Sequence, residues 1–424
     1  MNMISSNLKS FSVYGLFGTN DVHIPFDENI KILIGENGLG KTQVLNMLYY
    51  TLCKKFEKLI DYCFDKLELE FVDGDTISIS KIEIEQTLAR RQIVGDLRNV
   101  LDILRKLSDE KSDEKSDEKS DENEDNFSEN LKECRKTITE SLNQSEIMYF
   151  PTYRRVEEDL RNLGYDEEQF HKEDNRLIHF GMTDVRKRFD EIENTIDKLL
   201  KEGFSKISGE ILSQLVKGFT DTDTDTSILS RIDQDDIEII LARVGEQVSE
   251  ADKNEIRNIV VNQEIKQEIK NYSLLYFLQK LIEIYEKQKP LDNFIKVYRD
   301  ICNKYLIDKK VFYDESAIRI FVKSDLSGEE IQLSKLSSGE KQIISILSKI
   351  YLAEDKQRFI VLFDEPELSL SIIWQRQLLP DILNSKKCDF LLAVTHSPFI
   401  FDNELDRYAV GLNEYVKPAK TLTA

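Results

Sequence analysis

Residues 35–42 decide the fold, and they read Gly35-Glu36-Asn37-Gly38-Leu39-Gly40-Lys41-Thr42. This stretch matches the pattern GxxxxGK[ST], in which glycines let backbone N–H groups turn inward around phosphate oxygens. An apolar strand pattern at Lys31–Ile34 precedes it, and apolar positions with helical spacing follow from Gln43 to Tyr62. We expect Lys41 to reach the β- and γ-phosphates of a nucleotide and the Thr42 hydroxyl to ligate Mg²⁺. The phosphate-binding residues predicted by the motif are Gly35, Asn37, Gly38, Gly40, Lys41 and Thr42.

A second motif lies far along the chain, where the apolar run Phe359–Phe363 ends in Asp364 and Glu365. Two adjacent carboxylates at a strand end suit metal-assisted hydrolysis, because one can hold Mg²⁺ through water while the other polarises the attacking water. We assign the metal to Asp364 and the water to Glu365. The alternative is a buried strand with a capped end, and the phosphate-loop motif argues against it.

A third motif, Leu336-Ser337-Ser338-Gly339-Glu340-Lys341-Gln342, opens a predicted helix at Lys341–Leu352. In isolation it is only a good helix cap. Together the three motifs resemble those of ABC-type ATPases, in the Ser-Ser-Gly-Glu form of the SMC-like, RecF-like and OLD-like branches that are also grouped with AAA-family ATPases. The resemblance implies two heads that meet around two ATP molecules, with a helix N-terminus of one copy facing the γ-phosphate held by the other. The residues that would make this contact are Ser337, Ser338, Gly339 and Glu340.

The same resemblance gives a catalytic role to His396, which follows the apolar run Leu391–Val394. The switch histidine of the family sits at this position and senses the γ-phosphate. A lone histidine is more often structural, and it is the place after the strand that favours the functional interpretation. Between the motifs, Glu367–Pro380 resembles the D-loop region, which shapes the dimer seam. Relatives often have a histidine near the position of Ser371. Because this chain has a serine there, the role of that histidine is not carried over.

No clear glutamine marks the Q-loop of the family. By position, the corresponding stretch is Met148-Tyr-Phe-Pro-Thr-Tyr-Arg154-Arg155. One interpretation is that Arg154 and Arg155 contact phosphate. The other is that they pair with Glu157 and Glu158 at the start of a helix, and the sequence leaves both open.

The resemblance implies an α/β fold: an ABC-type P-loop ATPase head, with a mixed sheet flanked by helices, interrupted by a large helical insertion. We expect residues 1–152 to form the first part of the head, 153–310 the insertion or arm, and 311–424 the second part. Heptads in the middle are too short and irregular to predict a long coiled coil. Residues 108–126 contain repeats of Ser-Asp-Glu-Lys that have nothing to bury, so we expect a disordered surface loop there.

The composition favours a highly charged soluble protein. Of the 424 residues, 32% are charged, and no apolar run approaches the ~18 residues of a membrane span. Met1–Ser10 lacks the apolar core of a signal peptide, so we expect a cytoplasmic protein without a membrane partner. Five scattered cysteines without a CxxC pair fit a reducing compartment and disfavour a zinc site. The net charge of −21 disfavours nonspecific binding of nucleic acid. Arg186–Arg188 and Arg154–Arg155 are candidates for a local basic face, and the favoured alternative is that they lie on solvated helix faces.

Within this class, residues 149–155 and the tail at 401–415 resemble the stand-alone ATPases of bacterial antiphage systems such as PARIS and Septu. The resemblance implies a sensor or scaffold that hydrolyses ATP and dimerises, or forms a larger homo-oligomer, through ATP-bound heads. It also implies a separate effector protein, with a nuclease as the leading candidate, and a phage protein as the trigger. The alternative is a DNA-repair or chromosome-maintenance ATPase that clamps DNA as RecF-like or SMC-like proteins do, and the acidic total charge counts against it.

Overall fold

The computed structural model describes residues 7–36, 38–91, 127–142, 144–151, 182–217, 234–245, 248–261 and 272–419. Two compact units make up the chain: Met1–Ile178 together with Asp355–Ala424, and His179–Glu354. The acidic repeat at 108–126 lies outside the described residues. Each unit is a set of residues that pack together. The three-part division expected from the sequence stays a prediction.

A five-stranded parallel sheet forms part of the first unit, with the strand order β12-β3-β11-β10-β6. Every residue of β10 is buried, which is typical of a strand covered on both faces. The strand β3 lies between β11 and β12, so segments from both ends of the chain share one sheet. The strands are β3 (Ile30–Ile34), β6 (Glu146–Phe150), β10 (Phe359–Asp364), β11 (Cys388–Thr395) and β12 (Ala409–Gly411).

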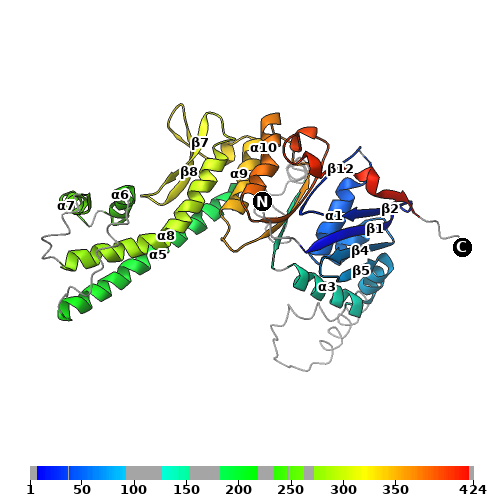
Figure 1. Cartoon of the computed structure of the whole chain (residues 1–424), viewed down its shortest axis with the longest axis horizontal. Helices are drawn as coiled ribbons and strands as arrows, with labels where there is room; N and C mark the ends of the chain where they lie inside the picture. Colours follow the sequence, from blue (N-terminus) through cyan, green and yellow to red (C-terminus); the bar gives the residue numbers. More distant parts are fainter. Residues whose placement is uncertain are drawn as a thin grey trace, which may run out of the picture. The chain divides into compact units, whose positions relative to one another are not determined.

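An antiparallel sheet with the order β13-β2-β1-β4-β5 forms the second layer of this unit. Along β4, buried residues alternate with half-buried ones, so one face of the sheet points to the core. The helix α1 (Lys41–Leu52) contributes buried residues to the same hydrophobic core as both sheets, and Figure 1 shows it beside the antiparallel strands. Those strands are β1 (Leu8–Leu16), β2 (Asn20–Pro25), β4 (Lys66–Phe71), β5 (Thr76–Ser80) and β13 (Val416–Pro418).

Two further α-helices of the first unit begin at side-chain caps. The Ser128 hydroxyl accepts a hydrogen bond at the start of α3 (Glu129–Ser141), and the Ser371 hydroxyl does the same for α10 (Ile372–Asn384). Short 3₁₀ helices fill the connections of this unit: η1 (Phe56–Asp61), η7 (Pro398–Ile400), η8 (Asp406–Tyr408) and η9 (Leu412–Tyr415).

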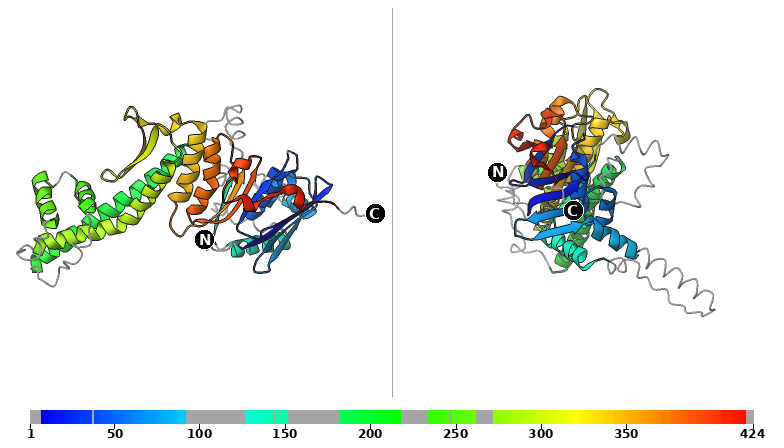
Figure 2. Two further views of the ribbon diagram at one scale, coloured as in Figure 1. Left: turned by 45° about the horizontal axis from the view of Figure 1, so that its top comes forward. Right: turned by 90° about the vertical axis from the view of Figure 1, so that its right-hand side faces the viewer.

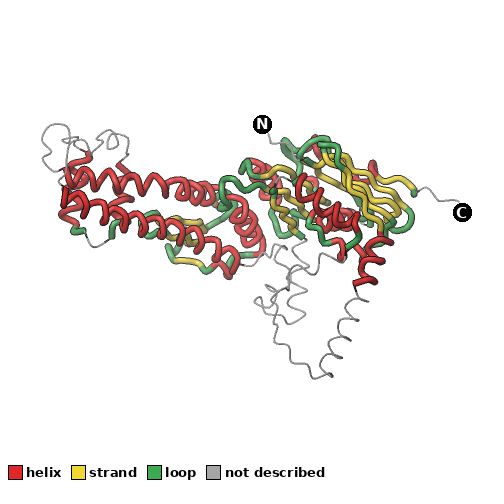
Figure 3. Tube along the Cα trace, turned by 90° about the horizontal axis from the view of Figure 1, so that it is seen from below, coloured by secondary structure: helices red, strands yellow, loops and turns green. Residues whose placement is uncertain are grey.

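Two long helices, α5 (Met182–Lys217) and α8 (Tyr272–Cys302), lie side by side in the second unit (Figures 2 and 3). They run in opposite directions, because Phe189 near the start of α5 contacts Tyr298 near the end of α8 at a ring distance of 5.7 Å, while Glu210 near the end of α5 accepts a hydrogen bond from Tyr276. The helices α6 (Gln234–Arg243) and α7 (Glu250–Val261) share a hydrophobic core with this pair. Helices of 36 and 31 residues are longer than the heptad pattern suggested.

A buried ion pair ties α6 to α8. Both side chains of the pair, Arg243 and Asp292, are 1% exposed and lie 2.8 Å apart. The Arg243 guanidinium also donates to the Gln288 side chain at 2.8 Å and to the Glu315 carbonyl at 2.8 Å. The rest of this unit comprises a three-stranded sheet and a helix: β7 (Lys309–Asp314), β8 (Arg319–Ser324), β9 (Glu330–Ile331), the 3₁₀ helix η6 (Leu333–Lys335) and α9 (Ser338–Tyr351).

The expected fold class is confirmed: the chain is an α/β head, with sheets flanked by helices, that carries a large helical insertion. Within the described ranges, no helix has both the length and the apolar character needed to cross a membrane.

Candidate functional site

The candidate site lies where neighbouring parallel strands end together. The last residue of β3, Ile34, is paired with Thr395 of β11, and Asp364 at the end of β10 is paired with Val394. On the other side of β10, Phe150 at the end of β6 is paired with Phe363. Because the carboxyl ends of parallel strands meet at one edge, the segments that follow β3, β10 and β11 converge there.

A glycine with left-handed backbone ends the segment that joins β3 to α1. Gly40 precedes α1 with φ of 83°, a left-handed conformation that costs a residue with a side chain about 1 kcal/mol or more. Lys41 is 5% exposed, and its ammonium donates to the carbonyls of Gly35 at 2.6 Å and Glu36 at 2.9 Å. Burial lowers the pKa of Lys41, and the nearby carboxylates of the site oppose this shift. The loop thus keeps a cation at the N-terminus of α1, where a phosphate group binds most favourably.

Thr42 and Asp364 are brought into direct contact. The Thr42 hydroxyl donates to a carboxylate oxygen of Asp364 at 2.9 Å, and Asp364 is 3% exposed. Oxygen donors of this kind are the ligands that Mg²⁺ prefers. Among the described residues, no group of three or more His, Cys, Asp or Glu side chains is arranged to hold a metal. The oxygen donors of Thr42 and Asp364 fit a Mg²⁺ ion that also binds phosphate oxygens and water.

Glu365 is held in an uncommon backbone conformation next to this pair. Its φ is 51°, and its N–H donates to the Val394 carbonyl at 2.8 Å. A non-glycine residue in the left-handed region is often a functional constraint that the surrounding structure enforces. Burial raises the pKa of Glu365, and the charges of Asp364 and Glu367 add to this shift, while His396 and Lys41 oppose it. A carboxyl group in this environment can act as a general base.

His396 points its imidazole toward Glu365, with Nε2 3.9 Å from a carboxylate oxygen. Its side chain is 34% exposed, so the imidazole lies at the surface of the site rather than in the core. The structure therefore brings together five of the sequence-predicted residues, from the start of α1, the end of β10 and the segments that follow β10 and β11: Lys41, Thr42, Asp364, Glu365 and His396.

Sequence reasoning missed the role of Glu367 as a hydrogen-bond acceptor. Its carboxylate accepts bonds from the backbone N–H groups of His396 and Ser397 and from the Thr395 hydroxyl. The signal that was available is the second carboxylate in Glu365-Pro366-Glu367, directly after Asp364 at the end of the second motif. Its partners come from a different strand, so the local sequence does not reveal them.

The third motif forms the N-terminus of α9 in the second unit. Ser337 and Glu340 make a capping box: the Ser337 hydroxyl accepts from the Glu340 N–H, and the Glu340 carboxylate accepts from the Ser337 N–H at 2.8 Å. Lys309 donates to both oxygens of Glu340 at 2.8 Å. Glu340 is thereby occupied within its own unit, whereas Ser337 and Ser338 are exposed and Gly339 is buried.

Three of the predicted site residues, Asn37, Arg154 and Arg155, lie outside the described residues. In the D-loop region, Ser371 caps α10 by accepting a hydrogen bond from the Trp374 N–H at 3.4 Å. The hydroxyl at this position therefore has a structural task of its own.

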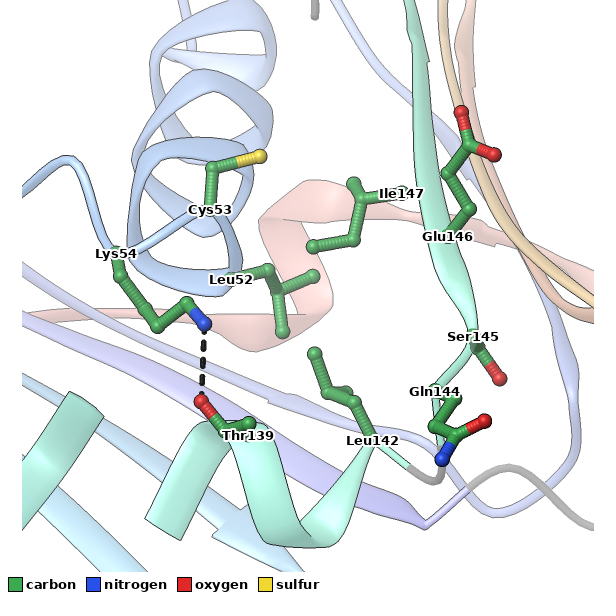
Figure 4. Close-up of a pocket in the computed structure, with 9 residues that line it drawn as sticks. All are labelled: Leu52, Cys53, Lys54, Thr139, Leu142, Gln144, Ser145, Glu146 and Ile147. Carbon is green, nitrogen blue, oxygen red and sulfur yellow. Dashed lines mark hydrogen bonds between the residues drawn. The ribbon is translucent and has the colours of Figure 1, made fainter. Parts of the chain in front are cut away.

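A cavity of about 420 Å³ lies at the other end of α1, away from the phosphate loop (Figure 4). Lys54, just after the helix, donates to the Thr139 hydroxyl of α3 at 2.9 Å along its rim. The cavity is separate from the strand ends that form the candidate site. Its lining consists of Leu52, Cys53, Lys54, Thr139, Leu142, Gln144, Ser145, Glu146 and Ile147.

Comparisons with known proteins bear on the family and the fold. A model of the AAA ATPase domain family, AAA_15, matches residues 8–401. No curated protein matches the sequence.

Similar solved structures include three Smc head domains. One, from Pyrococcus furiosus with an extended coiled coil and bound to the C-terminal domain of ScpA, is 10% identical with a TM-score of 0.39, covering 93% of this chain and 90% of that chain. A second, bound to the C-winged helix domain of ScpA, is 10% identical with a TM-score of 0.36, covering 93% of this chain and 90% of that one. A third, from Pyrococcus yayanosii with a coiled coil and joint, is 12% identical with a TM-score of 0.33, covering 93% of both chains.

Proposed function

Because the chain belongs to the AAA ATPase domain family, we propose that it binds ATP with Mg²⁺ at the ends of β3, β10 and β11 and hydrolyses it to ADP and phosphate. The observation that supports this most directly is the 2.9 Å hydrogen bond between Thr42 and Asp364. It joins the hydroxyl of the phosphate loop to the carboxylate of the second motif, beside the ammonium of Lys41. This is the arrangement that a magnesium-bound triphosphate requires.

In the proposed reaction, Lys41 binds the β- and γ-phosphates and Glu365 accepts a proton from the attacking water. The water oxygen attacks the γ-phosphorus, and the bond from that phosphorus to the oxygen of the leaving ADP breaks. His396, 3.9 Å from Glu365, contacts the γ-phosphate. Magnesium held by Thr42 and Asp364 would supply positive charge to the phosphates.

A pair of variants tests the reaction. We expect Lys41→Ala to lose ATP affinity, measured with a fluorescent ATP analogue. We expect Glu365→Gln to keep ATP affinity while phosphate release falls by about 10²–10³-fold, because binding contacts remain and water activation is lost. Asp402→Asn is the control, since Asp402 is an exposed carboxylate that pairs with Arg376 at the surface. Hydrolysis by Glu365→Gln at the wild-type rate would exclude Glu365 as the base.

We further propose that two copies dimerise around ATP, with Ser337, Ser338 and Gly339 of one copy contacting the γ-phosphate held by the other. Both serines are exposed at the N-terminus of a 14-residue helix, whose dipole favours an anion. Light scattering of Glu365→Gln should report a monomer without ATP and a dimer with it. Adding Ser338→Arg, which places a bulky side chain at the seam, should abolish the dimer while the ATP affinity of each copy is kept.

As the biological role, we propose a sensor or scaffold ATPase of a bacterial antiphage system that controls a separate effector. The sequence resemblance of residues 149–155 and 401–415 supports this role, as does the long α5–α8 pair, which offers an extended surface for protein contacts. The test is native mass spectrometry of Glu365→Gln expressed from its own genomic neighbourhood, with and without ATP. A defined assembly with a second encoded protein supports the role, and a bare homodimer contradicts it.

One observation favours DNA as a second candidate partner. A surface cavity of about 490 Å³ in the first unit is lined by four cations and a single carboxylate, Glu140. Such a cluster on a chain of net charge −21 suits a phosphate backbone. The cations are Lys54, Lys132, Arg135 and Lys136.

Filter binding to duplex DNA at two salt concentrations tests this candidate. If DNA binds at the cavity, replacing Lys132 and Lys136 with Glu should weaken binding and flatten its salt dependence. The same charge change at Lys198 and Lys201 on α5, both exposed, is the matched control. Equal loss in both double variants would indicate bulk charge rather than a site.

A further inference from the structure

We propose that Glu367 is a positioning residue that holds the imidazole of His396 against Glu365 by binding the backbone of the loop after β11. The inference rests on the proposed ATPase function of this site. We call residues 395–397 the switch loop. Within the described residues, the hydrogen bonds of the Glu367 carboxylate go to the switch loop.

The Glu367 carboxylate is bound on both oxygens. One oxygen accepts the N–H groups of His396 at 2.8 Å and Ser397 at 3.2 Å, and the other accepts the Thr395 hydroxyl at 2.7 Å. Thr395 is fully buried, so its hydroxyl needs this partner or another one inside the protein. Hydrogen bonds to a charged acceptor are about twice as strong as those between neutral groups. The Glu367 carboxylate therefore stabilises the position of the switch loop.

Gln375 of α10 forms hydrogen bonds both to the backbone of Glu367 and to the switch loop. Its amide N–H group donates to the carbonyls of Glu367 at 3.3 Å and Leu370 at 2.9 Å. Its amide oxygen accepts the Ser397 hydroxyl at 2.6 Å. The D-loop region, the first turn of α10 and the switch loop therefore form one hydrogen-bonded frame.

This frame bears on His396 because both groups of the candidate catalytic pair are attached to it. Glu365 lies two residues before Glu367, and its N–H donates to the Val394 carbonyl just before the switch loop. The 3.9 Å approach of His396 to Glu365 thus depends on how Glu367 seats the His396 backbone. Displacement of a catalytic group by about 1 Å can cost on the order of 10²-fold in rate.

Kinetics of Glu367 variants test the inference. We expect Glu367→Ala to lower kcat by about 10–100-fold with ATP affinity changed less than about threefold. Glu367→Gln keeps one acceptor oxygen and the shape of the side chain, so it should lose less than Glu367→Ala. Asp402→Asn, which removes an exposed carboxylate 56% open to solvent, is the control and should keep the wild-type kcat. Equal kcat in Glu367→Ala and wild type overturns the proposal.

A double-variant cycle separates positioning from general loss of structure. In a His396→Ala background the target of Glu367 is gone, so adding Glu367→Gln should change kcat less than about twofold. Additive losses would mean that Glu367 acts by another route and would overturn the proposal.

Nuclear magnetic resonance of the histidine rings tests the positioning role of Glu367 without relying on ATP hydrolysis. If the wild type hydrolyses no ATP, the proposed ATPase function is refuted, but this test of Glu367 still applies. The chain has four histidines, and ¹³C labelling of their rings gives few signals. The His396 signal is identified by its loss in His396→Ala. We expect Glu367→Ala to shift or broaden it and to leave the signal of His23, which is bonded to Ser12 at 2.7 Å on another sheet, in place. An unchanged His396 signal overturns the proposal.

Discussion

The Thr42 hydroxyl and the Asp364 carboxylate are hydrogen-bonded at 2.9 Å although 322 positions separate them in the chain. The contact exists because β3 and β10 both flank β11 in the parallel sheet and end at the same edge. Substitution of either residue is therefore the most direct test of the proposed metal site.

We predict that Asp364→Asn weakens ATP binding only when Mg²⁺ is present. The amide replaces the charged carboxylate that is proposed to hold Mg²⁺ through water, and a neutral group attracts the hydrated cation less strongly. Titration of a fluorescent ATP analogue should show a loss of about tenfold or more with Mg²⁺, a factor equivalent to about 1.4 kcal/mol. With EDTA the affinities of variant and wild type should coincide. A loss of the same size under both conditions would contradict the assignment of Asp364 to the metal.

We predict that Gly40→Ala impairs both folding stability and ATP binding. A Cβ atom there would meet the Phe17 ring at 2.9 Å, and φ of 83° is unfavourable for alanine. The matched control is Gly74→Ala, where φ is 100° but nothing lies within 4 Å of the added atom. Both variants should lose about 1 kcal/mol of stability or more. Only Gly40→Ala should lower ATP affinity, and equal affinities would show that the loop tolerates the change.

We predict that Glu340→Gln lowers the free energy of unfolding by an amount that depends on pH. Burial opposes ionisation of Glu340, but the hydrogen bonds and charge of Lys309 and the bonds from Ser337 outweigh it, so the pKa is lowered. A lowered pKa means that the carboxylate stabilises the fold above the ordinary Glu value of about 4.3, and that this stability is lost as pH falls through the folded-state pKa.

Thermal unfolding should show this as a difference between Glu340→Gln and wild type. At pH 7 the variant should lose about 1–2 kcal/mol, since both the capping box and the bond to Lys309 are weakened. The difference should shrink as pH falls below about 4.3. A difference that is constant with pH would point to packing rather than to charge.

We predict that Arg243→Met destabilises the second unit strongly. It leaves the Asp292 carboxylate, 1% exposed, without its cation, and breaking a buried pair in this way costs about 3–5 kcal/mol. Denaturant unfolding followed by circular dichroism measures the loss. The double variant Arg243→Met with Asp292→Leu should recover much of it, because no unpaired charge is left in the core. If the double variant is less stable than the single one, the pair contributes more than the charges account for.

Sequence reasoning predicted local features well and long-range contacts poorly. The phosphate loop, the strand ending in Asp364 and the helix capped by Ser337 each follow from a short run of residues with a characteristic spacing. Their proposed roles stay predictions. The task of Glu367 depends on β11 lying beside β10, which no local pattern encodes.

The long α5–α8 pair escaped prediction for a physical reason. Midway along its buried side, α8 has two buried polar residues, Gln288 and Asp292, and Pro290 lies between them in the sequence. These residues interrupt the apolar heptad pattern, although Asp292 is neutralised by Arg243 from α6. A helix pair whose contact includes buried polar residues is therefore not predicted by the spacing of apolar residues alone.

The place of β3 between β11 and β12 has a consequence for biosynthesis. A ribosome that has just produced β3 must add nearly the whole of the chain before either neighbour exists. Until then the strand Ile30–Ile34, four of whose five residues are buried in the finished protein, has two open edges in the cell. The parallel sheet can close only late in synthesis, and the nascent chain up to that point is a natural client for a chaperone.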